Sequence, residues 1–378
     1  MLKLFFSLLA VASISAVACT SWIISPEASE TGTYIMHKTR DWGGGKEVDV
    51  RLFFLQKDNA KYKALAFSPY MLFNEKGLGM IDTYVPPTRD GEHDKTFYIG
   101  KLMSMVVCNC ATVQEALAML ESFVKDGKRP VSEHYSLCDG KEAAVVEITP
   151  QHMAYRITKH GFSVHTNHHI YPEIAYLIKE TKIDAGVKSA TRLHITQNTL
   201  AGHLKEKGKI SLVDTLALSR LADPNFDGMC PFRKGTVCAS DYIAPAEQAG
   251  ILGTLLICPG PTKFAPAIPI PLSISKIPAV LENGDFGKLV YQIKRNLPED
   301  ASVQTRLQAL EQEFWKEYNE TYAAAKKKFD ADDMDGFKAM LQALVEKQTE
   351  QAYELVKTIL TEKNIPLKNP NPEPKPAD

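Results

Sequence analysis

The stretch SISAVACTSWIIS, residues 13–25, predicts how the fold begins. Its second half, CTSWIIS from Cys19 to Ser25, is a β-rich run, and a second such run, TGTYIMHKTRDW (31–42), follows after PEASE. Apolar β-rich runs separated by turn residues are typical of paired strands, so we expect a β-hairpin here. The hairpin starts at Cys19, which makes the role of this cysteine the central question of the sequence.

The residues before Cys19 have the features of a targeting signal. Lys3 supplies a short positive region, LFFSLLAVASISAVA is apolar but too short to span a bilayer, and Ala16-Val17-Ala18 fits a small-x-small cleavage site. We therefore expect residues 1–18 to be a signal peptide and the mature chain to be secreted or periplasmic. The alternatives are an uncleaved N-terminal anchor and a lipoprotein attached to the membrane through Cys19.

Composition argues against several classes of protein. Forty-four Lys and Arg residues against 45 Asp and Glu residues leave a net charge of −1, so there is no electrostatic reason to expect nucleic acid or an anionic membrane as partner. Seven cysteines in 378 residues are too few for a disulfide scaffold. The six besides Cys19 permit up to three bridges, and Cys230 and Cys238 are close enough in sequence to close a small loop.

The rest of the chain predicts a mixed α/β body followed by a helical extension. Strand patterns fill 48–85, 142–168 and 236–260, and helical patterns lie at 112–127, 189–208 and 211–223, with Thr112 and Ser211 as N-caps. The Pro-rich segment 265–279 is interpreted as the seam between the body (19–284) and the long amphipathic helices (285–364). Residues 365–378, rich in proline, are expected to be a disordered tail.

Three roles are open for Cys19 on local grounds. As residue one of a mature chain, its thiol would be a nucleophile and its own α-amine, with a pKa of about 7.7–8.0, could be the base. A lipidated cysteine is normally followed by a flexible polar tether, whereas here the apolar Trp22-Ile23-Ile24 follow almost at once. A structural cysteine is the third alternative.

Six motifs in order resemble N-terminal-nucleophile cysteine hydrolases. These are CTSWIIS with MHKTRDW, NEKGLGMIDTYVPP, TVQEAL, LCDGKEAAVVEIT, VHTNHH and SATRL. Together they resemble the acyl-coenzyme A:6-aminopenicillanic acid acyltransferase family, a relative of the choloylglycine hydrolases, which include bile salt hydrolases and penicillin V acylases. The resemblance covers roughly residues 19–260, whereas the C-terminal helices are similar to those of the N-terminal-cysteine dipeptidases.

The resemblance implies a role for each matching residue. Cys19 would be nucleophile and base, and Asp41 in TRDW would hold its α-amine. Asn167 in HTNHH would donate its amide to the oxyanion, and Arg192 in SATRL would favour the thiolate. Without the resemblance, each of the last three has a structural alternative. Asp41 could equally be a turn or cap residue, Asn167 could cap a turn at a strand end, and Arg192 could be a surface residue of a helix.

Two departures from the related families leave parts of the site open. Bile salt hydrolases have arginine three residues before the aspartate, whereas here that position is Lys38 and the arginine is Arg40. Tyr84 stands where bile salt hydrolases have a second oxyanion asparagine, in which respect the chain resembles penicillin V acylases. Lys38, Arg40, Tyr84 and His165, which neighbours Asn167, are therefore candidates for contacting the substrate or the oxyanion.

The histidines of VHTNHH do not predict a metal centre. His168 and His169 are adjacent and would point to opposite faces of a strand, and no HExxH motif or Cys/His companion stands nearby. We expect no metal and no cofactor. The expected partner is a small-molecule amide substrate, no membrane contact is expected unless Cys19 is lipidated, and a homo-oligomer is left open.

These observations lead to one expected fold and one expected function. The resemblance implies an α+β, four-layer αββα sandwich with a C-terminal helical extension. The expected activity is hydrolysis of a linear amide through an acyl-enzyme on Cys19, with acyl transfer by the same mechanism or a non-catalytic surface lipoprotein as alternatives. A dipeptide, an N-acyl amino acid, penicillin V or a conjugated bile salt would each fit as substrate.

Overall fold

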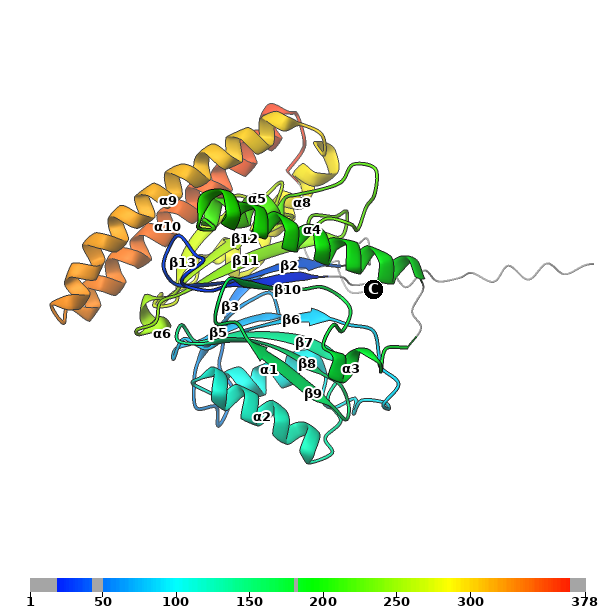
Figure 1. Cartoon of the computed structure of the whole chain (residues 1–378). Coiled ribbons are helices and arrows are strands. Elements are labelled where there is room, and N and C mark those ends of the chain that lie inside the picture. The colour runs from blue at the N-terminus through cyan, green and yellow to red at the C-terminus, as the bar shows by residue number, and fades with distance from the viewer. Residues whose placement is uncertain (1–18, 43–49, 180–182, 368–378) are drawn as a thin grey trace, which may run out of the picture.

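Two antiparallel sheets form the centre of the computed structural model, which describes residues 19–42, 50–179 and 183–367 (Figure 1). The six-stranded sheet has the order β10-β1-β2-β11-β12-β13 and the seven-stranded sheet the order β3-β4-β5-β6-β7-β8-β9. The strands of the first are β1 (Thr20–Ile24), β2 (Tyr34–Asp41), β10 (Phe162–His165), β11 (Thr236–Ala244), β12 (Thr254–Cys258) and β13 (Ile268–Pro271). Those of the second are β3 (Leu52–Leu55), β4 (Ala64–Phe67), β5 (Met71–Asn74), β6 (Gly79–Tyr84), β7 (Glu133–Cys138), β8 (Ala143–Ile148) and β9 (Met153–Ile157).

Helices cover the outer faces of both sheets, which confirms the predicted four-layer αββα architecture (Figure 1). Helices α1 (Ile99–Val107) and α2 (Val113–Lys125) pack on the seven-stranded sheet, and α4 (Ile183–Lys207) and α5 (Leu212–Ser219) on the six-stranded one. Three long helices follow: α8 (Asp285–Asn296), α9 (Ala301–Asp330) and α10 (Met334–Glu362). Short helices are α3 (Pro172–Ala175), α6 (Ala249–Leu252) and α7 (Ala279–Glu282).

The predicted hairpin at the start of the fold is confirmed as β1 and β2, whose register pairs Thr20 with Thr39 and Ile24 with Ile35. Both strands are buried along their whole length, because the seven-stranded sheet covers one face of their sheet and helices cover the other. Side chains alternate between faces, so Ile23 joins the core between the sheets while Trp22 and Ile24 pack under the helices. Cys19 and Ser21 have the same parity as Ile23 and therefore belong to the inter-sheet face.

The C-terminal helices share the core of the sheets instead of forming a separate body. Residues of α8, α9 and α10 belong to the same hydrophobic cluster as β2, β5 and β12. The interpretation of 265–279 as a seam is wrong, because part of it forms β13. Its prolines Pro269 and Pro271 are tolerated because β13 is the last strand of its sheet, where a missing N–H breaks no ladder on the open side.

Local predictions along the chain have mixed outcomes. Thr112 and Ser211 cap α2 and α5 as expected, Ser211 within a capping box. All seven cysteines are free, buried thiols, so the bridge that the spacing of Cys230 and Cys238 permits is not formed. The predicted signal peptide (1–18) and most of the Pro-rich tail (368–378) lie outside the described residues. Within the described part of the chain, the helices are too short or too polar to cross a bilayer.

Candidate active site

Cys19 lies at the head of β1 and is 2 % exposed. Its backbone nitrogen donates a hydrogen bond to Asn167 Oδ1 at 3.1 Å, and the backbone N–H of Asp41 faces its sulfur. Burial raises the pKa of the Cys19 thiol, and the nearby Lys38 ammonium opposes that effect. The thiol is therefore protonated at neutral pH in this state, and it needs a base before it can act as a nucleophile.

Lys38 on β2 lies on the same inter-sheet face as Cys19, and it is the cation that lies toward the thiol. It is fully buried, and its ammonium forms an ion pair with the Asp82 carboxylate of β6. Burial would lower the pKa of Lys38, but the charges of Asp82 and Cys19 outweigh it and raise that pKa. The structure thus brings Lys38, one of the two predicted cations, close to Cys19.

Arg40 is directed elsewhere on the inter-sheet face. Its guanidinium donates to Ser68 Oγ and lies 4.8 Å from the centre of the Tyr70 ring. The same guanidinium faces the buried thiol of Cys238. Arg40 therefore packs between the two sheets, and Lys38 rather than Arg40 interacts with Cys19.

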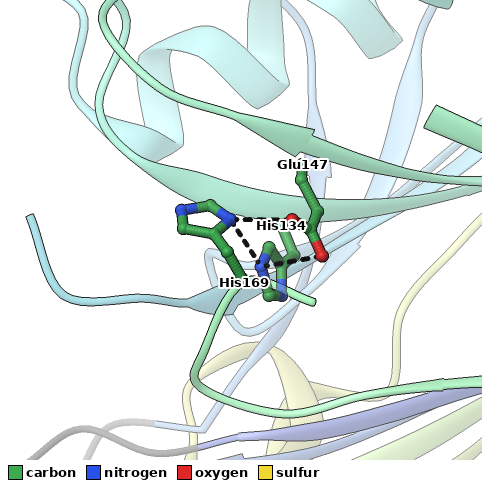
Figure 2. Close-up of side chains that lie close together, drawn as sticks. All are labelled: His134, Glu147 and His169. Carbon is green, nitrogen blue, oxygen red and sulfur yellow. Dashed lines mark hydrogen bonds and ion pairs between the residues drawn. The ribbon is translucent and has the colours of Figure 1, made fainter. Parts of the chain in front are cut away.

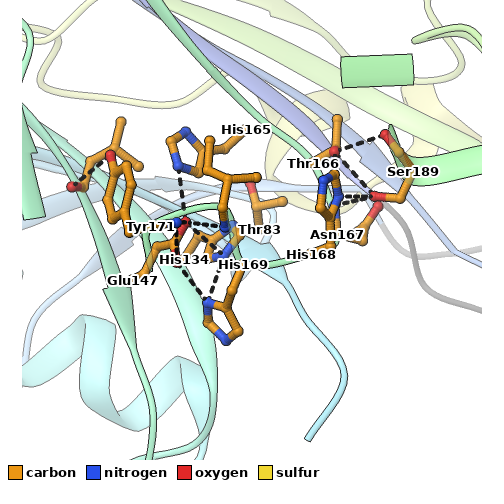
Figure 3. Close-up of polar contacts among 12 residues, drawn as sticks. Thr83, His134, Glu147, His165, Thr166, Asn167, His168, His169, Tyr171 and Ser189 are labelled. Carbon is orange, nitrogen blue, oxygen red and sulfur yellow. Dashed lines mark hydrogen bonds and ion pairs between the residues drawn. The ribbon is translucent and has the colours of Figure 1, made fainter. Parts of the chain in front are cut away.

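Asn167 connects four parts of the site. Besides accepting from Cys19, its Oδ1 accepts from Arg192 Nη2 at 2.6 Å, and its Nδ2 donates to the Tyr84 carbonyl at 2.6 Å. Its backbone nitrogen donates to Ser189 Oγ at 2.9 Å, in a network that also includes Thr166 and His168 (Figure 3). The amide predicted to donate to an oxyanion is thus occupied here, while the amide oxygen holds Cys19.

Arg192 supports the start of β1 from helix α4. The residue is 1 % exposed, and its Nε donates to Thr20 Oγ1 at 3.0 Å while Nη1 donates to the Gly228 carbonyl. Burial, together with repulsion from Arg233, lowers its pKa to about 9. Cys19 and Asn167 are therefore both positioned by one buried guanidinium.

Asp41 ends β2 beside Cys19, but the bonds to its carboxylate come from other residues. Thr236 Oγ1 donates to Oδ1 at 2.6 Å, and Arg233 Nη2 donates to Oδ2 at 2.8 Å. Burial raises the pKa of Asp41, and the Arg233 charge and the Thr236 bond oppose the rise. The atom that holds the Cys19 nitrogen is Oδ1 of Asn167, so the predicted role of Asp41 as amine anchor stays a prediction.

Tyr84 and His165 lie near Asn167 in different ways. Tyr84 offers its backbone carbonyl to Asn167, and burial raises the pKa of its hydroxyl. His165 is 3 % exposed, and its Nε2 lies 3.4 Å from Glu147 Oε1 in a buried cluster with His134 and His169 (Figure 3). Their predicted contacts with substrate or oxyanion stay predictions.

Sequence reasoning missed several residues that complete the site. Asp82 neutralises Lys38, and buried Glu133 lies close enough to sense Asp82, Lys38 and Cys19. Burial and the Asp82 charge raise the pKa of Glu133 well above its usual range. Asp82 stands in the quoted motif NEKGLGMIDTYV, whereas no motif marked Glu133, Arg233 or Thr236.

A cavity of about 810 Å³ opens beside Asp41. Trp42 and Arg233 are among the residues that line it. Its other basic side chains are Lys234, Lys263, Lys294 and Arg295, against the acidic Asp223, Asp227 and Glu299. This surplus of positive charge suits an anionic group.

One comparison with known proteins shows the family of the chain. A sequence model of the acyl-coenzyme A:6-aminopenicillanic acid acyl-transferase family matches residues 28–219, about half of the chain. The chain belongs to this family. The match includes Lys38, Asp41, Tyr84, Asn167 and Arg192, and it begins after Cys19.

Solved structures similar to the chain include two variants of conjugated bile acid hydrolase from Clostridium perfringens. One is 14 % identical with a TM-score of 0.46, and the other is 15 % identical with a TM-score of 0.45. In both cases the alignment covers 67 % of this chain and 92 % of the hydrolase chain. No curated protein matches the chain.

Proposed function

We propose that this protein is an amidohydrolase that cleaves a linear amide through an acyl-enzyme on Cys19, after residues 1–18 are removed. The observation that carries the proposal is the hydrogen bond from the Cys19 nitrogen to Asn167 Oδ1. It holds the nitrogen that would become the α-amine, while the thiol beside it is buried close to Lys38. Membership of an acyltransferase family supports the same class of chemistry.

The reaction uses the two groups of one residue. The free α-amine takes the proton of the Cys19 thiol, and the thiolate attacks the carbonyl carbon of the amide. Lys38 and the Asp41 backbone N–H stabilise the thiolate. As the tetrahedral intermediate collapses, the α-ammonium returns the proton to the leaving nitrogen and the C–N bond breaks. Water, deprotonated by the same amine, then hydrolyses the thioester and frees Cys19.

Asn167 positions the nucleophile in this scheme. Its Oδ1 fixes the Cys19 nitrogen, and Arg192 fixes Asn167 in turn. The donation from Nδ2 to the oxyanion that the resemblance implies would require this amide to leave the Tyr84 carbonyl. A donor that is already engaged at 2.6 Å is a weaker candidate than one aimed into open space.

The substrate we favour carries a carboxylate next to the scissile amide, as N-acyl amino acids and dipeptides do. The basic cavity beside Asp41 supports this assignment because its Lys and Arg side chains can pair with an anion. Hydrolysis is preferred over coenzyme-dependent transfer because an exported enzyme has no ready supply of acyl-coenzyme A.

Intact mass spectrometry of the exported protein tests the first step. A mass that starts at Cys19 with no adduct supports the proposal. A diacylglyceryl adduct with an acylated amine would remove the base and make the protein a lipoprotein instead.

Turnover tests the second step, with a panel of N-acyl amino acids, dipeptides, penicillin V and conjugated bile salts. Cys19→Ser should fold and lose nearly all turnover. Cys110→Ser is the matched control, because Cys110 is an equally buried thiol under the helices of the other sheet. Wild-type rates in Cys19→Ser would refute the mechanism.

A further inference from the structure

Four buried side chains form a cluster that the proposed reaction does not use: His134, Glu147, His165 and His169, called here the histidine cluster. Their exposed fractions are 1 %, 0 %, 3 % and 3 %. Figure 2 shows His134, Glu147 and His169 pointing toward one another between the sheets. Burying so many ionisable groups is costly unless they are paired or bind a cation.

The β-sheet register explains why these residues meet. His134 on β7 and Glu147 on β8 are direct cross-strand partners, so their side chains lie side by side on one face. His165 ends β10 in the opposite sheet, where it pairs with Ser21. His169 follows in the segment after β10. The cluster therefore joins the two sheets.

The donor atoms converge at metal-ligand spacing. His134 Nε2 and His169 Nδ1 are 3.0 Å apart, and His169 Nδ1 and Glu147 Oε2 are 3.1 Å apart. His134 Nε2 lies 3.8 Å from Glu147 Oε1. Ligands at about 2.05 Å around a tetrahedral Zn²⁺ are about 3.3 Å from one another. The three atoms thus have the separations of three corners of such a site.

Hydrogen bonding alone satisfies the cluster poorly. His169 Nδ1 is close to both His134 Nε2 and Glu147 Oε2, but it can carry one proton. If that proton points to Glu147, the lone pair of His134 Nε2 lacks a well-aligned donor. A neutral imidazole beside a carboxylate is the form that binds a metal.

A candidate fourth ligand and an outer shell lie beside His134, Glu147 and His169, the three residues whose donor atoms converge. His165 Nε2 lies 3.4 Å from Glu147 Oε1, and both of its ring nitrogens lack a hydrogen-bond partner among the described residues. The Glu147 carboxylate is oriented by the backbone N–H groups of Ile170, at 2.8 Å, and Tyr171, at 3.2 Å. Such bonds to a ligating carboxylate are typical of metal sites.

We propose that the histidine cluster is a structural site for a divalent transition-metal ion, Zn²⁺ by preference, held by His134, Glu147, His169 and His165. Imidazole and carboxylate donors in a buried site fit four-coordinate Zn²⁺. Sequence reasoning expected no metal because it considered only the neighbouring histidines of VHTNHH. The ion fastens the segment 165–169, which carries Asn167, to the seven-stranded sheet. The proposal does not depend on the catalytic role of Cys19.

Metal content of the full-length chain, purified without a histidine tag, is the first test. We expect about one equivalent of zinc by elemental mass spectrometry, loss of it after chelation, and recovery with ZnCl₂ alone. The recovery should raise Tm by about 5 °C or more, because a ligand that binds only the folded state stabilises it. Less than a tenth of an equivalent of any transition metal, with no rise in Tm on adding ZnCl₂, would overturn the proposal.

Variants locate the ion. His169→Ala should lower the zinc content at least tenfold, whereas His152→Ala should leave it unchanged. His152 is the matched control because it also pairs with a carboxylate, Asp90 at 3.1 Å, but lies outside the cluster. If His169→Ala does not fold, X-ray absorption of the wild type decides. Nitrogen and oxygen neighbours at about 2.0–2.1 Å support the site, and sulfur at about 2.3 Å would place the zinc on cysteine and refute it.

Discussion

Asn167 can act through either end of its amide, and two substitutions distinguish the ends. In the structure the oxygen holds the Cys19 nitrogen and Arg192, while the nitrogen donates to the Tyr84 carbonyl. Asn167→Asp keeps both acceptor bonds and loses the donor. Asn167→Ala loses all three bonds.

The magnitudes follow from the bond types. A hydrogen bond from a charged group such as Arg192 contributes about 1.5–3 kcal/mol, and a neutral bond about 0.5–1.5 kcal/mol. Asn167→Ala therefore loses hydrogen bonds that contribute about 2.5–6 kcal/mol. Because this side chain is half-buried, water can replace part of that hydrogen bonding. We expect a loss of about 3 kcal/mol in unfolding free energy and of about 6 °C in Tm.

Activity separates the two roles more sharply than stability. If the oxygen positions Cys19, Asn167→Ala removes hydrogen bonds worth about 2–4.5 kcal/mol and lowers kcat by about 30- to 2,000-fold. Asn167→Asp keeps the two hydrogen bonds to the side-chain oxygen, so its kcat should fall by only about tenfold. The assay is kcat on the best substrate of the panel, with Tm measured on the same samples.

One result would refute this reasoning. If both variants fold and both lose about 10²–10³-fold in kcat, the amide nitrogen is the working end, as expected of an oxyanion donor. Asn167 would then turn away from Tyr84 when substrate binds.

Three further predictions test other parts of the structure. Lys38→Met should shift alkylation of Cys19 by iodoacetamide to higher pH, because the ammonium that lowers the thiol pKa is gone; an unchanged pH profile, read by peptide mass spectrometry, would contradict this. Lys294, whose pKa burial lowers to about 8, loses its charge as pH rises through that value. KM for a carboxylate substrate should therefore rise above pH 8 in the wild type but not in Lys294→Met, and an ester analogue should show no step in either protein. Glu311→Ala should lower the unfolding free energy by about 3–5 kcal/mol, because it leaves Arg220 buried without its partner; a loss under 1 kcal/mol in urea denaturation would mean that this pair does not hold α9 to the body.

The parts of the fold that could be predicted from the sequence are those with local causes. The hairpin at Cys19 follows from two apolar runs around a turn, and the helix starts follow from Thr112 and Ser211, whose side chains cap residues three positions on. β13 could not be predicted, because Pro269 and Pro271 are acceptable only on an edge strand, and edge position depends on the assembled sheet.

The candidate site divides in the same way. Cys19, Asn167 and Arg192 were predicted as site residues from ordered motifs, and the structure brings them together through two hydrogen bonds to Asn167 Oδ1. Arg233 and Glu133 stand in stretches without a recognisable motif. They reach the site through pairing with Asp41 and through the register of β7, which only the fold determines.

The histidine cluster follows from the same register. Rules for short motifs ask which residues are close in sequence, whereas His134 and Glu147 become neighbours when β7 pairs with β8. The cluster lies near Cys19 for the same reason: His165 pairs across the sheet with Ser21, two residues after Cys19. Asn167 lies between His165 and His169, so an ion bound there restrains the residue that holds the Cys19 nitrogen. Cys19 contributes no ligand to the ion. The proposed coupling therefore runs in one direction, from the ion to Cys19. Loss of the proposed ion would loosen Asn167, whereas replacing the Cys19 thiol would leave every proposed ligand in place.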